Sequence, residues 1–258
     1  MSTKIHPTAI IDKSATVGQN VEIGPFTIIG PDCVIGDNCI IGSSVAIHRW
    51  TELGEGCRIW HGASLGADPQ DLKFKGARTK VVIGKNTVIR EYATINLSTE
   101  EGDVTRVGDN CFIMAYSHVA HECTVGNGVI LANSATLAGH VTVEDFAIIG
   151  GLTPVHQFAR VGCYCMIGGS SAVQKDVLPY TKAFGNPLAM YGLNTIGLTR
   201  RGFNQEQKDL IEKAYRLIFR SQLNTSQAVV RIKESLPMSP EITHIVEFIE
   251  SSERGITK

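Results

Sequence analysis

The chain has 258 residues, 43% of them hydrophobic, so it is long and apolar enough to bury a sizeable core. Its formal net charge of −1 excludes the strong positive field that nucleic-acid-binding proteins usually carry, so we expect no nucleic-acid partner. The sequence contains no run of 18 or more apolar residues, and its N-terminal segment lacks an apolar signal region. We therefore expect a cytoplasmic protein with no membrane span.

A six-residue repeat runs from the start of the chain to about Val177. Steps of six from Ile5 to Val173 give 29 positions, and all of them are Ile, Leu or Val except Asp71, Ala77 and Glu101. The residue after the aliphatic one is often Gly, which suits either a bend with an unusual φ angle or a close approach of two backbones. The residue four places after the aliphatic one is usually small.

Three such units predict one triangular coil of a parallel β-helix, with the aliphatic and small side chains pointing inward. Stacked coils pair through parallel strands about 4.8 Å apart, and the repeat is long enough for about ten coils. Six of the seven cysteines occupy the small inward position, which predicts reduced core residues rather than nucleophiles, disulfides or a zinc ribbon: Cys33, Cys39, Cys57, Cys111, Cys123 and Cys165.

Two polar segments interrupt the repeat without changing its phase. The first excursion lies between Leu65 and Ile83, and the second lies between Ile95 and Val107. Both are rich in charged and loop-forming residues, so they predict loops that leave the prism and return to it. Loops on a rigid scaffold are frequent carriers of function.

Beyond about Val177 the pattern becomes helical. Residues 186–194 predict a connector, and Asn204 with Gln207 forms a capping-box pattern ahead of a helix over 205–221. A second helix is expected after Asn224 and a third from Pro240 to Ser252. We divide the chain into a β-helix domain (1–186) and a small α-helical C-terminal domain (187–258). Exposed solenoid ends and flat faces favour association, so we also expect a homo-oligomer.

The coil length brings histidines together. Residues 18 apart lie one above the other, so Gly139 and then Gln157 stack on His121. His140 and His156 neighbour these two residues, and His118 comes just before His121. Such a ridge suits two chemistries, namely zinc ligation by several imidazoles or proton transfer by one imidazole. A purely structural β-helix would not require histidines there.

Several motifs resemble those of the UDP-N-acetylglucosamine O-acyltransferases of lipid A synthesis, and the likeness runs along essentially the whole chain. The motifs are PQDLKFKG (69–76), HVAHECTVGN (118–127), LANSATLAGHV (131–141), IIGGLTPVHQF (148–158), MIGGSSAV (166–173) and GLNTIGLTRRGF (192–203). The resemblance implies a left-handed parallel β-helix, a homotrimer with active sites between subunits, and no cofactor or metal. It implies transfer of a (3R)-hydroxyacyl group from acyl carrier protein to the 3-hydroxyl of the glucosamine unit of UDP-N-acetylglucosamine.

The resemblance also assigns roles to residues. His121 matches the general base, and Gly139 matches the backbone N–H donor for the oxyanion. Gly169 lies where the family limits acyl length, and Asn194 and Arg200 match nucleotide contacts. The remaining expected substrate-binding residues are Gln70, Asp71, Lys73, His118, His140, His156 and Gln157.

Three departures from the family pattern leave alternatives open. Glu122 stands beside the base where the family commonly has Asp, Asn96 replaces a common His, and Ile196 replaces an acidic residue. The last two allow an acceptor sugar with a 3-amine. Rival enzymes are a zinc-dependent γ-class carbonic anhydrase and an acetyltransferase that uses coenzyme A. The first excursion and the strand after it also carry a run of basic residues: Lys73, Lys75, Arg78, Lys80, Lys85 and Arg90. This run either forms a docking surface for acidic acyl carrier protein or is a solvated charged face.

Overall fold

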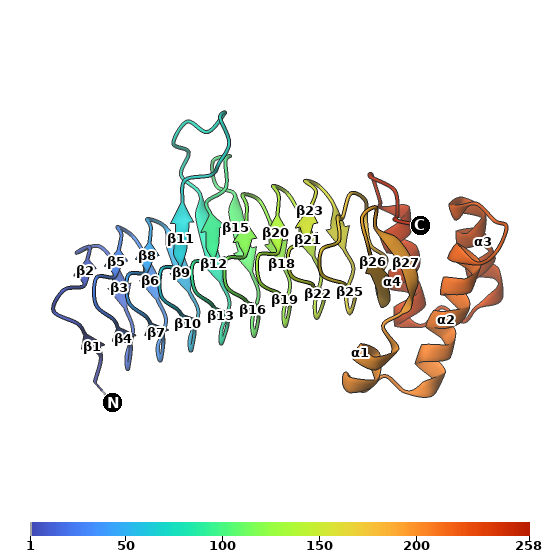
Figure 1. Cartoon of the computed structure of the whole chain (residues 1–258), viewed down its shortest axis with the longest axis horizontal. Coiled ribbons are helices and arrows are strands. Elements are labelled where there is room, and N and C mark those ends of the chain that lie inside the picture. Colours follow the sequence, from blue (N-terminus) through green and yellow to red (C-terminus); the bar gives the residue numbers. More distant parts are fainter. Residues whose placement is uncertain (1) are drawn as a thin grey trace.

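The computed structural model describes residues 2–258. Short parallel strands stack into a long three-sided prism, and the helices gather at its C-terminal end (Figure 1). The first sheet contains β1 (Lys4–Ile5), β4 (Glu22–Ile23), β7 (Ile40–Ile41), β10 (Arg58–Ile59), β13 (Val88–Ile89), β16 (Phe112–Ile113), β19 (Ile130–Leu131), β22 (Ile148–Ile149) and β25 (Met166–Ile167).

The other two sides of the prism are built in the same way. The second sheet contains β2 (Ile10–Ile11), β5 (Ile28–Ile29), β8 (Ala46–Ile47), β11 (Ser64–Ala67), β14 (Thr94–Asn96), β17 (His118–Val119), β20 (Thr136–Leu137) and β23 (Pro154–Val155). The third sheet contains β3 (Thr16–Val17), β6 (Val34–Ile35), β9 (Thr51–Leu53), β12 (Lys80–Ile83), β15 (Val104–Val107), β18 (Thr124–Val125), β21 (Thr142–Val143) and β24 (Arg160–Val161).

Strand register confirms the predicted coil and the phase of the repeat. Lys4 pairs with Glu22, 18 residues further on. Across the first excursion Arg58 pairs with Val88, 30 residues on, and across the second Val88 pairs with Phe112, 24 residues on. In both cases the residues added to the 18-residue coil are a multiple of six, so each excursion returns to the repeat in phase.

The expectation of about ten coils agrees with the first sheet, where β26 (Thr181–Phe184) pairs parallel with β25 and completes a row of ten parallel strands. The repeat up to Val173 supplies nine of these strands, because the excursions consume three six-residue units without forming a strand of the first sheet. Those units contain the three exceptions to the aliphatic pattern, Asp71, Ala77 and Glu101, which lie outside the strands.

The inward positions of the repeat form the core, as predicted. Ile29, Leu65 and Ile95 are at most 1% exposed. All seven cysteines are buried free thiols, and Cys33 Sγ donates to the backbone oxygen of His48 at 2.9 Å. The inward cysteines therefore pack as small core residues.

Close backbone approach explains the glycines of the repeat. A Cβ on Gly24 would lie 2.7 Å from the carbonyl carbon of Gly42 in the next coil. The positive φ angles occur two residues later, at corner residues such as Phe26 (59°) and Tyr116 (62°). The alternative that the glycine itself needs an unusual φ is therefore wrong at Gly24.

The C-terminal part contains more structure than the sequence predicted. The predicted connector includes a strand, β27 (Ala189–Leu193), which pairs antiparallel with β26 (Thr181–Phe184) at the end of the first sheet. A short helix, α1 (Thr195–Arg200), was not predicted. The three expected helices are present as α2 (Gln205–Phe219), α3 (Thr225–Ser235) and α4 (Pro240–Glu250), with the capping box of Asn204 and Gln207 formed. No helix within residues 2–258 has the length and apolar character needed to cross a membrane.

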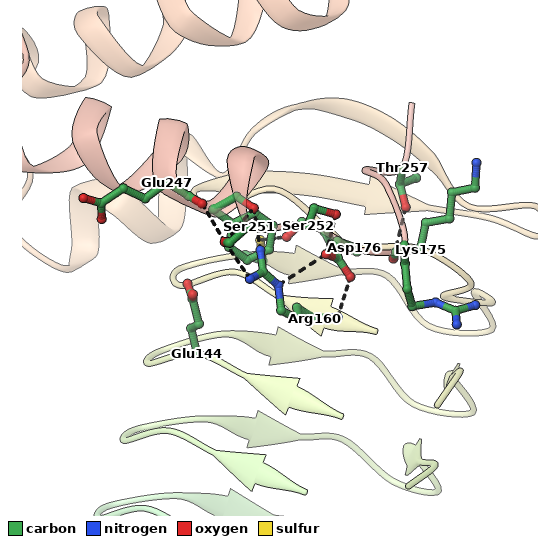
Figure 2. A network of polar contacts seen from close by, with 12 residues as sticks. Glu144, Arg160, Lys175, Asp176, Glu247, Ser251, Ser252 and Thr257 are labelled. Atoms are coloured by element: carbon green, nitrogen blue, oxygen red, sulfur yellow. Dashed lines mark hydrogen bonds and ion pairs between the residues drawn. The ribbon is translucent and has the colours of Figure 1, made fainter. Parts of the chain in front are cut away.

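Arg160 and Asp176 join the end of the prism to α4 (Figure 2). Asp176 is 1% exposed, and its carboxylate accepts bonds from Arg160 Nε at 3.2 Å and Ser252 Oγ at 2.7 Å. Arg160 also donates to Ser251 Oγ at 3.0 Å, and its guanidinium carbon lies 4.1 Å from the centre of the Phe248 ring. Loss of either charge would leave its partner without compensation in a largely enclosed place, so this contact holds α4 against the prism.

Candidate active site

His121 and Glu122 lie at the corner where the chain passes from the second sheet to the third, between β17 and β18. The Glu122 carboxylate is hydrogen-bonded to His121 Nδ1 and lies 3.5 Å from Nε2 of His140. Thr99 donates both its backbone N–H and its hydroxyl to the same carboxylate. The His121 and Glu122 side chains are 17% and 9% exposed, so the pair is largely enclosed but still open to a ligand.

The contacts of Glu122 favour one tautomer of His121. Burial raises the pKa of Glu122, but hydrogen bonds from Thr99 and His121 outweigh it and the net pKa is lowered. An ionised carboxylate at Nδ1 keeps the imidazole proton on that nitrogen, and Nε2 is then the nitrogen with a lone pair.

The ridge continues one coil further on at Gly139 and His140. The rings of His121 and His140 meet edge to face with centroids 5.3 Å apart, and His140 stacks on Phe158 at 4.5 Å. A Cβ on Gly139 would lie 2.4 Å from Cε1 and 2.6 Å from Nε2 of His121. Only glycine leaves room for the imidazole in this position.

His156 and Gln157 occupy the same corner in the following coil, between β23 and β24. Both are exposed, and His156 Nδ1 lies 3.0 Å from the backbone oxygen of Gln157. The histidines at 121, 140 and 156 thus follow one edge of the prism, in the order that the coil length predicted.

His118 faces the same region from β17. Its Nδ1 lies 2.7 Å from Thr94 Oγ1 on the neighbouring strand β14. Burial lowers the pKa of His118, and the nearby His121 lowers it further, so the neutral imidazole is favoured at neutral pH.

Both excursions leave the prism at this corner. The first excursion connects β11 to β12, two coils before His121. The second connects β14 to β15, one coil before His121. The first excursion stands clear of the prism above β11 in Figure 1. It carries Gln70, Asp71 and Lys73, of which Gln70 and Lys73 are exposed, and Asp71 accepts a bond from the Lys73 N–H at 2.8 Å.

Three predicted site residues lie away from this corner in the single chain. Gly169 follows β25 at the corner between the first and second sheets, where its Cβ would meet Gly151 O at 3.2 Å. Asn194 caps α1 and donates to Tyr164 O at 2.9 Å, which places it beside the third corner. Arg200 is exposed at the end of the same short helix. One chain therefore does not bring all the predicted residues together.

Thr99, Thr94 and Phe158 contact the site but were not singled out from the sequence. The repeat contains a signal for two of them, since Thr94 pairs in register with His118 and Phe158 follows His140 by one coil. Thr99 lies in an excursion, where the repeat assigns no neighbours.

The corner also contains a set of atoms that could hold a metal ion. One ligand atom each from His121, Glu122 and His140 lie within 4.8 Å of one another. Imidazole and carboxylate donors suit zinc, so the geometry is compatible with a three-ligand site.

Comparison with known proteins identifies the class of enzyme. The family model described as bacterial transferase hexapeptide (six repeats) matches residues 14–49, 32–67 and 105–139. The model described as UDP N-acetylglucosamine O-acyltransferase, domain 2, matches residues 176–257. Together with the prism and its histidine corner, these matches define a hexapeptide-repeat acyltransferase.

The relatives narrow the assignment further. The acyl-[acyl-carrier-protein]–UDP-N-acetylglucosamine O-acyltransferase of Thermodesulfovibrio yellowstonii is 50% identical over 99% of each chain. That of Burkholderia orbicola is 47% identical over 99% of this chain and 100% of its own. The chain therefore belongs to the UDP-N-acetylglucosamine O-acyltransferase family, as its motifs predicted.

Solved structures agree with this membership. A UDP-N-acetylglucosamine acyltransferase from Bacteroides fragilis is 45% identical, with a TM-score of 0.96 over 98% of this chain and 100% of that chain. A relative from Acinetobacter baumannii has 39% identity and a TM-score of 0.95 over 98% of this chain and 99% of its own. The expected left-handed parallel β-helix with a small α-helical C-terminal domain is confirmed.

Proposed function

We propose that this chain transfers a (3R)-hydroxyacyl group from acyl carrier protein to the 3-hydroxyl of the glucosamine unit of UDP-N-acetylglucosamine. This would be the first step of lipid A biosynthesis and would take place in the cytoplasm. The names of the relatives supply both substrates. The observation that carries the proposal is the bond between His121 Nδ1 and the Glu122 carboxylate, because it leaves Nε2 as the basic nitrogen.

The reaction then proceeds by general base catalysis. Nε2 of His121 takes the proton of the sugar hydroxyl as its oxygen attacks the thioester carbonyl. Gly139 packs against the imidazole, and its N–H stabilises the oxyanion that forms. When the intermediate collapses, the C–S bond breaks and the imidazolium returns its proton to the leaving thiolate. Glu122 stabilises the imidazolium during the interval.

A homotrimer completes the proposed site. Its residues lie at three different corners of one chain, so neighbouring subunits would have to supply the parts that one chain keeps apart. In this arrangement the first excursion, with Gln70, Asp71 and Lys73, reaches the ridge of the next subunit. The substrates bind along the ridge to His118, His140, His156 and Gln157. The nucleotide binds to Asn194 and Arg200, and Gly169 leaves room for a long acyl chain.

We also propose that residues 1–186 and 187–258 are the two domains of the chain.

Acyl carrier protein would meet the exposed lysines of the first excursion. Lys73 and Lys75 are exposed there, and an acidic partner is attracted to such a surface. Other members of the basic run have acidic neighbours, since Lys80 pairs with Glu52 at 2.6 Å and Arg90 pairs with Glu91 at 2.9 Å. Lys80 and Arg90 are therefore partly neutralised, and the positively charged surface offered to a partner is smaller than the basic run in the sequence suggests.

Mass spectrometry of products tests the proposal. The purified protein is offered UDP-N-acetylglucosamine with a mixture of hydroxyacyl carrier proteins, and we expect an ester-linked hydroxyacyl product. The analogue with a 3-amine, included as a second acceptor, tests the amide alternative raised by Asn96 and Ile196. Acyl-coenzyme A serves as the competing donor. Transfer from coenzyme A alone, or to neither sugar, would contradict the proposal.

A metal-dependent enzyme is the second candidate, favoured by the ligand atoms of His121, Glu122 and His140. Elemental analysis of the purified protein and activity after chelation separate the two candidates. The acyl transfer proposed above requires no metal, so full turnover by chelated protein supports it, and carbon dioxide hydration restored by zinc supports the alternative.

A further inference from the structure

The second excursion contacts the catalytic pair directly. Thr99 Oγ donates to Glu122 Oε1 at 2.8 Å, and the Thr99 backbone N–H donates to the same oxygen. The other carboxylate oxygen, Oε2, is hydrogen-bonded to His121 Nδ1. One carboxylate therefore connects a loop on one side to the imidazole on the other.

The length of the Glu122 side chain makes this bridge possible. The Glu122 backbone is anchored by its own N–H, which donates to Thr105 Oγ1 at 3.1 Å. From this anchored backbone the Glu122 carboxylate reaches both the His121 imidazole and Thr99 in the second excursion. Asp, which is one methylene shorter and common at this position in the family, has less reach.

The second excursion is itself held by the first. Glu101 Oε2 accepts the Arg78 N–H at 2.7 Å, and Arg78 O accepts the Gly102 N–H at 3.0 Å. Thr79 Oγ1 donates to Ser98 O at 3.0 Å, and both of these side chains are at most 1% exposed. Thr99 thus sits in a short segment with anchors on both sides.

We propose that Thr99 is a positioning residue for the transfer reaction, acting through Glu122 on His121, and that the second excursion exists in part to hold it there. This inference rests on the proposed function. A hydroxyl donor fixed by the loop selects the Glu122 conformation that bonds Nδ1, and so orients Nε2 towards the substrate. Thr99 contacts neither the sugar nor the thioester in this scheme.

The matched variants are Thr99→Val, which keeps the shape and loses the donor, and Thr99→Ser, which keeps the donor. We expect Thr99→Val to lower kcat about tenfold, the scale of one hydrogen bond to a charged group, with KM for the UDP-sugar within about twofold of wild type. Thr99→Ser should restore most of kcat. Thr124→Val, on the exposed side of β18, is the control and should leave both constants unchanged.

A double-mutant cycle tests the role of the loop. Glu101→Ala removes the acceptor of the Arg78 N–H and should lower kcat less than Thr99→Val does. The double variant should lose little more than Thr99→Val alone, because both changes act through Glu122. Circular dichroism checks that each variant is folded.

The outcomes separate this inference from the proposed function. If Thr99→Val keeps kcat within twofold of wild type while His121→Ala is inactive, the positioning role is wrong and the general base stands. If Thr99→Val raises KM and leaves kcat unchanged, Thr99 belongs to substrate binding and the inference is also wrong. Full turnover by His121→Ala would overturn both.

Discussion

At the scale of single residues, the candidate active-site corner depends on the carboxylate of Glu122 and on the absence of a side chain at Gly139. Glu122 meets Thr99, His121 and His140, and each oxygen has a partner. Gly139 leaves the space that the His121 ring fills. The imidazole is therefore constrained both along its Nδ1 bond and across its face, which is the kind of preorganisation that proton transfer requires.

Replacement of His121 by Ala should abolish transfer while leaving the fold intact, because the side chain lies outside the inward positions of the repeat. General bases contribute about 10²-fold or more, so we expect activity at or below about a hundredth of wild type in the product assay. His6→Ala, at an exposed histidine far along the prism, is the control and should be fully active. Turnover above a tenth of wild type in His121→Ala would remove this residue from the role of base.

Gly139→Ala should impair catalysis more than stability. The added Cβ would overlap the His121 ring, which must move away from its bond with Glu122. A displacement on the order of 1 Å can cost about 10²-fold in rate, so we expect kcat to fall on that scale. The melting temperature is measured in parallel. A variant that melts like wild type and turns over normally would mean that the ring position is not critical.

At the scale of elements, α4 is attached to the prism through two sets of polar contacts. Near its C-terminal end, Arg160 reaches the last turn and Ser251 (Figure 2). Closer to its start, His244 Nε2 lies 2.8 Å from Glu144 Oε2. The hydrogen bond with Glu144 raises the pKa of His244, and burial opposes this effect only in part.

The contact between His244 and Glu144 should make the docking of α4 dependent on pH. Because the folded-state pKa of His244 is raised, its stabilising contribution is fully present below the unfolded value of about 6.5 and is lost as pH rises through the folded value. We expect His244→Gln to lower the free energy of unfolding relative to wild type at pH 5.5, and the difference to shrink by pH 9. Denaturant titrations at both pH values measure this, and a difference that grows with pH would contradict the assignment.

At the scale of the whole molecule, a single prism separates the predicted residues over three corners. The histidine ridge and both excursions share one corner, Gly169 lies at another, and Asn194 lies beside the third. A stiff solenoid cannot fold back to unite them, because each coil contacts only its neighbours. Assembly of identical chains around a symmetry axis is the remaining way to build one site from all three.

Complementation between inactive chains tests this arrangement. We expect His121→Ala and Lys73→Ala chains to be inactive alone, and co-expressed chains to recover activity. If each site takes His121 from one subunit and Lys73 from the next, random mixing leaves about a quarter of the sites intact. Recovery close to that fraction, with the trimer mass checked by light scattering, supports a shared site. Mixed trimers without activity would show that both residues act within one chain.

The sequence by itself determined the prism, its coil length, its buried cysteines and the alignment of the histidines. These features follow from a period of six, because a local repeat that stacks on itself specifies its own long-range neighbours. The capping box of Asn204 and Gln207 was equally readable, since it is a contact between residues three apart.

Only the tertiary structure decided what the excursions and the C-terminal connector do. Strand β27 pairs with β26 at the end of a sheet, which no local pattern in residues 186–194 specifies. Thr99 reaches Glu122 across 23 residues, and Asn96, 4% exposed, donates to Asp68 O at 2.8 Å at the foot of the first excursion. Outside the repeat, contact between distant residues depends on how loops pack against the completed prism, and sequence spacing does not encode that packing.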